Sequence, residues 1–201
     1  MATTDDKGLF WNSNGGDRKY SADSLGKWLS KFFTTGVMPN DFQVTATGSN
    51  MKVTMGKGYV NIANPGGAIQ GGKVRLFEEN TEFTIDTADS VYPRIDTIVI
   101  ERNDNDRDIT AKYIKGTAAE TPTATAPVRN TTTYQLVIAE IYVAAGASTI
   151  SNSNITRKCA DNTVCGIVTG TVSNNQITYG TTDLTPGVSE LADGEFYFVY
   201  E

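Results

Sequence analysis

Two clusters in the sequence carry residue types that bind metal ions. Asp104, Asp106 and Asp108 alternate along the chain, as the carboxylates of a calcium-binding loop do. The glycine and the distal glutamate of an EF-hand loop are missing, so we predict a solvated turn. Cys159 and Cys165 have five residues between them, which is not a zinc spacing, and the chain has no histidine to complete a site. We expect no metal site and two reduced, partly buried thiols, with a local disulfide after release from the cell as the alternative.

A search for catalytic residues finds no complete set. Without histidine, the chain lacks the Ser-His-Asp and Cys-His arrangements and the usual general base near neutral pH. Glu140 stands alone in an apolar segment, which favours a strand-end or interface carboxylate over a catalytic one. Gly66-Gly67 and Gly71-Gly72 are not followed by the signature or the helix of a phosphate-binding loop. A glycosidase needs two facing carboxyl groups, and nothing in the sequence indicates such a pair. We predict that the protein is not an enzyme and binds no cofactor.

The composition excludes further classes of partner. Lys plus Arg is 17 and Asp plus Glu is 23, which gives a net charge of −6 and a pI near 4.7. Nucleic-acid binding relies on neutralising phosphates, so an acidic chain without a basic block is a poor candidate. Residues 1–7 show neither the basic start nor the apolar run of a signal peptide, and no stretch is apolar enough to span a bilayer. We expect synthesis in the cytoplasm and no membrane insertion.

A β-hairpin is expected to organise the core that positions these residues. Residues 92–103 begin with a Tyr-Pro pair and are apolar on both faces, which is typical of a buried central strand. Residues 103–106 form a dense turn signal, and residues 108–115 resume the alternation. A second buried strand is predicted over residues 134–143. We expect the charged residues of the first strand to lie at its ends and reach water: Arg94, Asp96, Glu101 and Arg102.

One amphipathic helix precedes the strands. It is predicted over residues 21–35, with Ser21 as its N-cap and Gly36 as its stop. Its apolar residues follow the spacing of a single helix face, and a helix this short needs that face packed against the sheet or against a helix of another subunit. These apolar residues are Leu25, Trp28, Leu29, Phe32 and Phe33.

The pattern as a whole predicts a mainly β fold. We expect a β-sandwich or barrel with one short N-terminal amphipathic helix and a small C-terminal β module. Short strands are predicted near residues 51–55, 59–62, 73–77 and 82–86, and residues 116–133 form an extended Thr/Ala/Pro loop. The expected divisions are an arm with the helix (residues 1–37), the β-rich core (38–170) and the C-terminal module (171–201).

The C-terminal module ends in a strand that is apolar on both faces, residues 196–200. Asp193-Gly194 before it is a good hairpin turn, so we expect pairing with residues near 176–179 or with Leu184. A free edge of this kind promotes aggregation. Burial against symmetry-related copies is one solution, and completion of the main domain's own sheet is the other.

Several stretches resemble a family of structural proteins of phage tails. Over roughly residues 10–170, their order and spacing are similar to those of tail baseplate or tail-fibre proteins from phages and prophages of Gram-positive bacteria. The proteins in question are of the baseplate-upper-protein or receptor-binding-protein kind. The ending, residues 179–201, is similar to a short module found on such proteins, although the long variable region that often precedes it in the family is absent here. The stretches are Gly16-Asp17-Arg18, Tyr20-Ser21-Ala22, Gly36-Val37 with Pro39, Tyr92-Pro93-Arg94-Ile95-Asp96, Lys115-Gly116-Thr117, Ala144-Ala145-Gly146-Ala147, Asn154-Ile155-Thr156 and Cys165-Gly166-Ile167-Val168-Thr169-Gly170.

The resemblance implies a structural component of the phage tail, made in the host bacterial cytoplasm. We expect a baseplate subunit or fibre-anchoring adaptor that assembles with other tail proteins and with itself, as a trimer by analogy with tail spikes and fibres. The alternative is a tip protein that binds a receptor or glycan on the host surface. Phe10 and Trp11 either cover their own core or dock on a neighbouring subunit. The expected interface residues are Phe10, Trp11, Trp28, Phe32, Phe196, Phe198 and Tyr200.

Overall fold

The computed structural model describes residues 21–67, 71–170, 177–180 and 196–199. The chain divides into two compact units, Met1–Thr169 and Gly170–Glu201, and each is described by itself. Among the described residues, no helix is long and apolar enough to cross a membrane.

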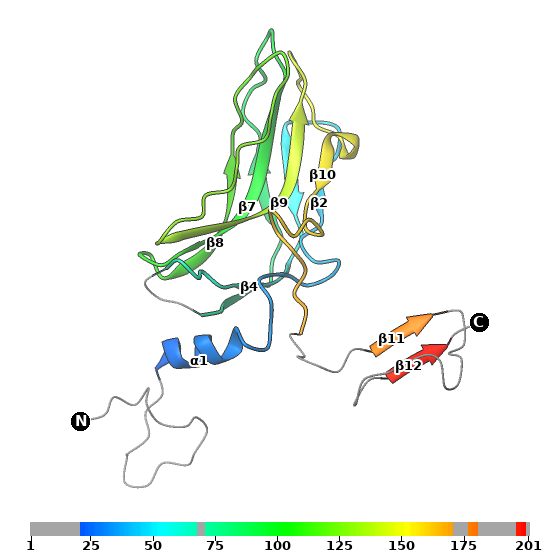
Figure 1. Cartoon of the computed structure of the whole chain (residues 1–201). Coiled ribbons are helices and arrows are strands. Elements are labelled where there is room, and N and C mark those ends of the chain that lie inside the picture. The colour runs from blue at the N-terminus through cyan, green and yellow to red at the C-terminus, as the bar shows by residue number, and fades with distance from the viewer. Residues whose placement is uncertain (1–20, 68–70, 171–176, 181–195, 200–201) are drawn as a thin grey trace. The chain divides into compact units, whose positions relative to one another are not determined.

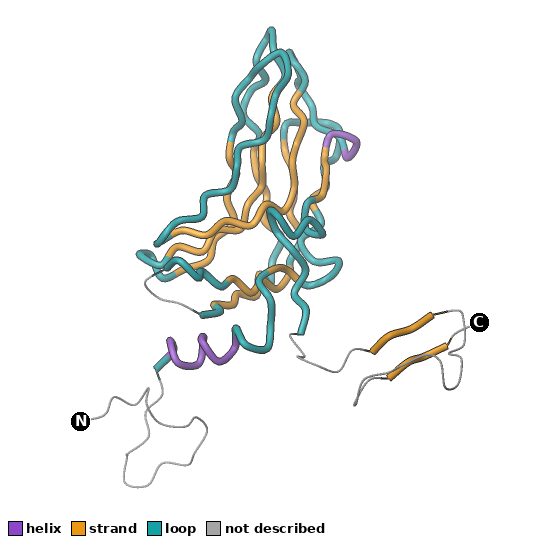
Figure 2. Tube along the Cα trace, viewed as in Figure 1, coloured by secondary structure: helices purple, strands orange, loops and turns teal. Residues whose placement is uncertain are grey.

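The first unit is mainly β and sandwich-like, with three antiparallel sheets and no closed barrel (Figures 1 and 2). The predicted fold class is therefore confirmed, and the sandwich-like architecture is the one present. One sheet has the order β1 (Gly36–Val37), β4 (Gly58–Ile62), β5 (Lys73–Phe77). The second has the order β2 (Val44–Thr45), β3 (Lys52–Met55), β6 (Thr81–Thr84). The third has the order β10 (Ile155–Arg157), β9 (Thr133–Val143), β7 (Arg94–Asn103), β8 (Asp108–Ile114).

The predicted hairpin lies at the centre of the largest sheet. β7 pairs antiparallel with β8 on one side and with β9 on the other, and a register shift between Ile98 and Val99 marks a β-bulge. Both predicted buried strands, residues 92–103 and 134–143, are therefore confirmed. Their apolar side chains form the middle of the core, which includes Ile98, Ile100, Leu136, Ile138 and Ile141.

The charged residues of β7 do not reach water, and this expectation was wrong. Arg94, Asp96, Glu101 and Arg102 are 1%, 0%, 6% and 1% exposed. A charge can be buried when a partner charge and hydrogen bonds replace its water. Glu101 meets both conditions, since its Oε1 lies 2.6 Å from Lys112 Nζ and its Oε2 accepts from the Gln135 amide at 2.7 Å.

Arg94 and Asp96 form the most deeply buried ion pair, with 2.9 Å between Arg94 Nε and Asp96 Oδ1. Arg94 also donates to the carbonyl oxygens of Thr87 and Asp86, at 2.9 and 2.5 Å. Asp96 accepts from the Tyr113 hydroxyl and from the Gly116 N–H, each at 2.7 Å. The network therefore joins β7, β8, the segment after β6 and the start of the long loop.

The helix is shorter than predicted. α1 spans Ala22–Leu29, and Ser21 caps it as expected by accepting from the Ser24 N–H at 3.0 Å. The helix ends at Leu29, with Ser30 as its C-cap. Beyond it, the Thr34 N–H donates to the Thr169 carbonyl at 3.0 Å, and the Thr169 N–H donates to Thr34 Oγ1 at 2.8 Å. Gly36 begins strand β1 and does not stop the helix.

β1 continues this contact with the segment that precedes Gly170. The Val37 N–H donates to the Gly166 carbonyl at 3.0 Å, and the Val168 N–H donates to the Val37 carbonyl at 2.9 Å. With the two bonds at Thr34, these four hydrogen bonds form a clasp between residues 34–37 and 166–169.

Loops and turns follow the predictions with one exception. Residues 104–107 form the predicted turn, and residues 116–128 contain no helix or strand. Asp104 is not solvated, however, because Arg102 Nε lies 2.6 Å from its Oδ1 and the side chain is only 8% exposed.

Cys159 and Cys165 are free thiols as expected, and both are fully buried rather than partly so.

The described part of the second unit is a two-stranded sheet. β11 (Ile177–Gly180) and β12 (Phe196–Val199) pair in the register Ile177↔Phe196, which confirms the predicted partner but not the hairpin. The pairing is parallel, so the two strands do not form a tight hairpin. The alternative partner, Leu184, lies outside the described residues. The predicted turn Asp193-Gly194 lies outside the described residues.

We predict that Tyr113 makes the stability of the first unit sensitive to alkaline pH. Burial, and then the hydrogen bond to Asp96, raise the pKa of Tyr113 from 10 to about 12. Because the folded-state pKa is the higher one, the stabilisation is complete below pH 10 and is lost as the pH rises toward about 12. In urea titrations, the free energy of unfolding of the wild type should fall more steeply over this window than that of Tyr113→Phe.

The control is Tyr142→Phe, at an exposed position of β9, and its free energy of unfolding should follow that of the wild type. Equal slopes for all three chains would contradict the prediction.

Candidate interaction surface

The aromatic residues predicted on the helix are exposed. Trp28 and Phe32 are 42% and 47% exposed, and their ring centroids lie 4.8 Å apart at an angle of 49°. Leu25 and Phe33 are also exposed, at 39% and 43%. The sheet does not cover these four residues, here called the apolar cluster. Exposed apolar clusters of this kind are a recurring feature of protein interaction sites.

The other predicted interface residues are not brought to this cluster by the described structure. Phe196 and Phe198 lie in β12, at the register positions of Ile177 and Tyr179. Phe10, Trp11 and Tyr200 lie outside the described residues, so their role stays a prediction.

Glycines attach α1 to the first sheet. Gly26 is the buried residue of the helix, and its carbonyl accepts from the Gly72 N–H at 2.8 Å. A Cβ on Gly71 would lie 2.4 Å from the Lys27 backbone nitrogen, and Gly71 has a φ of +95°. Gly26 weakens the helix in isolation. Here it permits the helix to approach the sheet backbone closely.

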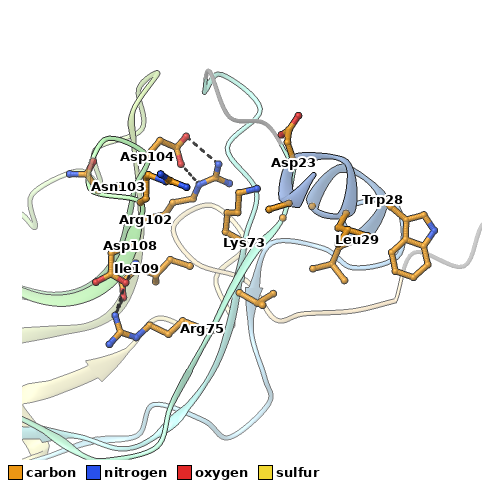
Figure 3. A pocket seen from close by; sticks show the side chains of 16 residues that line it. Asp23, Trp28, Leu29, Lys73, Arg75, Arg102, Asn103, Asp104, Asp108 and Ile109 are labelled. Carbon is orange, nitrogen blue, oxygen red and sulfur yellow. Dashed lines mark hydrogen bonds and ion pairs between the residues drawn. The ribbon is translucent and has the colours of Figure 1, made fainter. Parts of the chain in front are cut away.

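A groove of about 1050 Å³ opens between α1, β5 and the β7–β8 turn (Figure 3). Trp28 and Leu25 of the apolar cluster line it from the helix, and Val74 lines it from β5. The groove therefore continues the apolar cluster toward the edge of the first sheet.

The turn side of the groove is charged, and most of its charges are paired. Arg102 binds both carboxylate oxygens of Asp104, at 2.6 and 3.1 Å, and donates to the Gly71 carbonyl at 2.7 Å. Arg75 lies 2.9 Å from Asp108 and also donates to the Ile109 carbonyl. These bonds fix the β7–β8 turn to the first sheet.

Lys73 is a cation in the groove that forms no ion pair with the described residues, and Arg107 on the β7–β8 turn is another. Burial lowers the pKa of the Lys73 ammonium group, and the nearby positive charge of Arg102 lowers it further. Figure 3 shows Lys73 between α1 and the turn that holds Asp104. The nearby carboxylates of Asp23 and Asp104 raise this pKa without forming an ion pair with Lys73.

The residues that carried candidate chemistry do not form a site in the described structure. Among the described residues, no three His, Cys, Asp or Glu side chains are placed to hold a metal ion. Glu140 lies on β9 opposite Thr156 of β10 and pairs with Lys158 Nζ at 3.4 Å. The described groove offers apolar area and the cations Lys73 and Arg107, which suit binding.

Sequence patterns predicted the apolar cluster but not the groove. The helical spacing identified Trp28 and Phe32. The sequence predicted only a short strand for Lys73, Val74 and Arg75. Their position in the groove depends on which edge of β5 is paired, and the local pattern does not show this. The repeat Arg-x-Asp at residues 94–96 and 102–104 was the available signal for the buried ion pairs, since residues two apart share one face of a strand.

Comparison of the chain with protein-family models, curated proteins and solved structures gave no match. The function of this surface must therefore be inferred from its own geometry.

We predict that Gly71 is essential for holding α1 on the sheet. Gly71→Ala should cost about 1–3 kcal/mol more of unfolding free energy than Gly146→Ala, because an added Cβ meets the helix backbone in the first case and open space in the second. Both glycines have positive φ, so Gly146→Ala controls for backbone strain. Hydrogen exchange should also quicken in α1 of Gly71→Ala alone. Equal stability losses with unchanged exchange in α1 would refute the role of this contact.

Proposed function

We propose that the protein is a non-enzymatic structural component of a phage tail, a baseplate subunit or fibre-anchoring adaptor that assembles with itself and with other tail proteins. The observation that carries the proposal is the exposed apolar cluster on α1 and the turn after it. Trp28 and Phe32 stack on each other at the surface, where large aromatic side chains are typical anchors of protein interfaces. The sequence resemblance to tail proteins supplies the class of partner.

The rigid attachment of α1 also supports the proposal. The Gly26–Gly72 bond and the clasp at Thr34 hold both ends of the cluster on the sheet. A preordered surface loses less conformational entropy on binding than a mobile one. Assembly as a homotrimer in the virion follows from the family resemblance and is part of the proposal.

A second candidate is a glycan-binding tip, and one observation favours it. Trp28 lines an open groove, and aromatic rings on groove walls can stack on sugars. A glycan array separates the two: binding that is lost in Trp28→Ala would favour the tip, whereas no binding together with stable association to another tail protein would favour the adaptor.

We predict that the full chain is heavier in solution than its 21.7 kDa mass. Light scattering should report about three times this mass, and the double variant Trp28→Ala/Phe32→Ala should shift it toward one chain. Tyr142→Ala removes an aromatic side chain of similar exposure from β9 and should leave the mass unchanged. Deletion of residues 190–201 tests the terminal strand separately, since retention of the assembly would exclude that strand as the oligomer contact.

A further inference from the structure

The edge of the first sheet carries free backbone hydrogen-bonding groups beside exposed apolar side chains. On β4, the Tyr59 carbonyl accepts from the Met38 N–H at 3.2 Å, and the Tyr59 N–H donates to Asp41 at 2.8 Å. Tyr59 thus directs its backbone groups toward β1. Its partner on β5 is Leu76, so the backbone groups of Leu76 point away from β4, and those of Val74 do the same because their direction alternates along a strand.

α1 covers only the beginning of this edge. The Gly72 N–H, which has the same direction, donates to the Gly26 carbonyl of the helix. Farther along, no described residue pairs with the backbone of Val74 or Leu76. Their side chains are 47% and 59% exposed. A strand edge with these properties is a template for another strand.

We propose that β5 of a second copy of this chain pairs antiparallel with this edge. The pairing is isologous, with Arg75 on the two-fold axis, and it gives two identical hydrogen-bonded pairs, Val74 with Leu76 of the other copy and the reverse. Each pair exchanges two N–H···O bonds and places its two apolar side chains on one face. The two sheets become one six-stranded sheet across the contact.

The charges at the ends of β5 complement each other in this register. Lys73 begins the strand, and the exposed Glu78 and Glu79 follow its end. Antiparallel pairing sets Lys73 opposite Phe77 of the second copy. Because α1 occupies the edge at Gly72, Glu78 and Glu79 of that copy leave the strand beside Lys73. The register therefore brings a counter-ion to Lys73, which forms no ion pair with the described residues. Arg75 meets its symmetry mate, but its charge is already paired with Asp108.

The groove lies beside the first part of this edge. From β5 it is lined by Lys73, Val74 and Arg75, and Leu76 is not part of its lining. Its helical wall, Leu25 and Trp28, is exposed and apolar, and it would cover the incoming apolar side chains.

This contact adds a specific interface to the self-assembly proposed above. The inference rests on that self-assembly and does not depend on a role in a phage tail. An isologous contact joins copies in pairs, so it would appear as a concentration-dependent step above the three-chain mass expected at low concentration. The deletion of residues 190–201 tests a terminal clasp, and the variants below test β5, so the two failures are distinguishable.

The decisive experiment is a charge-exchange series on the full-length chain, followed by sedimentation equilibrium over a range of concentrations. Lys73→Glu alone and Glu78→Lys/Glu79→Lys together should each weaken the pairwise association about five-fold or more, because both symmetric pairs become repulsive. The variant that combines all three changes should recover wild-type association. A combined variant as weak as its parents would overturn the antiparallel register.

Two further variants test the edge itself. Val74→Pro removes an N–H that bonds nothing within the described chain, so it should abolish the pairwise step while the thermal midpoint stays near that of the wild type.

Arg75→Cys places two thiols on the axis, where Cα atoms of such a pair lie about 4.5 Å apart, close enough for a disulfide. Mild oxidation should give a covalent dimer with Arg75→Cys and not with Tyr142→Cys, since the native cysteines are buried. Unchanged association in Val74→Pro, or no dimer from Arg75→Cys, would overturn the proposal.

Discussion

The first unit depends on two arginines buried at opposite ends of β7. Arg94 donates to carbonyls of Thr87 and Asp86, in the segment that leaves the sheet of β6, and Arg102 donates to carbonyls of Ile62 and Gly71 in the sheet of β4 and β5. Each guanidinium is neutralised by the aspartate two residues later. Removing one partner of a buried ion pair costs about 3–5 kcal/mol, so the central strand positions both other sheets through polar contacts as well as apolar ones.

This arrangement explains why the interaction surface is firmly held. Arg102 fixes Gly71, the glycine on which α1 rests, and Arg75 fixes the β7–β8 turn across the groove. The helix, the strand edge and the turn are thus connected through one chain of hydrogen bonds. A surface that must present exposed tryptophan and phenylalanine rings in one geometry benefits from such support.

The sequence predicted the helix and the strands better than the contacts that their side chains and ends make. Apolar runs identified β7 and β9, and the spacing of Trp28 and Phe32 identified a helix face, because these patterns are local. The burial of Arg94 and Arg102 was not predictable from charge alone, since both also donate to backbone carbonyls. Those that accept from Arg102 lie 40 and 31 residues away in the sequence, and those that accept from Arg94 lie 7 and 8 residues away. The end of α1 was also missed: the helix ends at Leu29, and Thr34, which was predicted to lie in it, bonds Thr169 instead. Likewise, Asp193-Gly194 suggested a hairpin, but the pairing of β11 with β12 is parallel, and a local turn signal carries no information about strand direction.

The clasp between residues 34–37 and 166–169 has a mechanical consequence. The chain passes to its second unit at Gly170, directly after the clasp. A pulling force applied beyond Gly170 would load the two Thr34–Thr169 bonds first and the two bonds of Val37 next. Because Thr34 lies shortly after the end of α1 at Leu29, force on the C-terminal side would be transmitted to the base of the helix. The rupture force of this joint is therefore set by a few backbone and side-chain hydrogen bonds, and it should yield before the sheet built on β7.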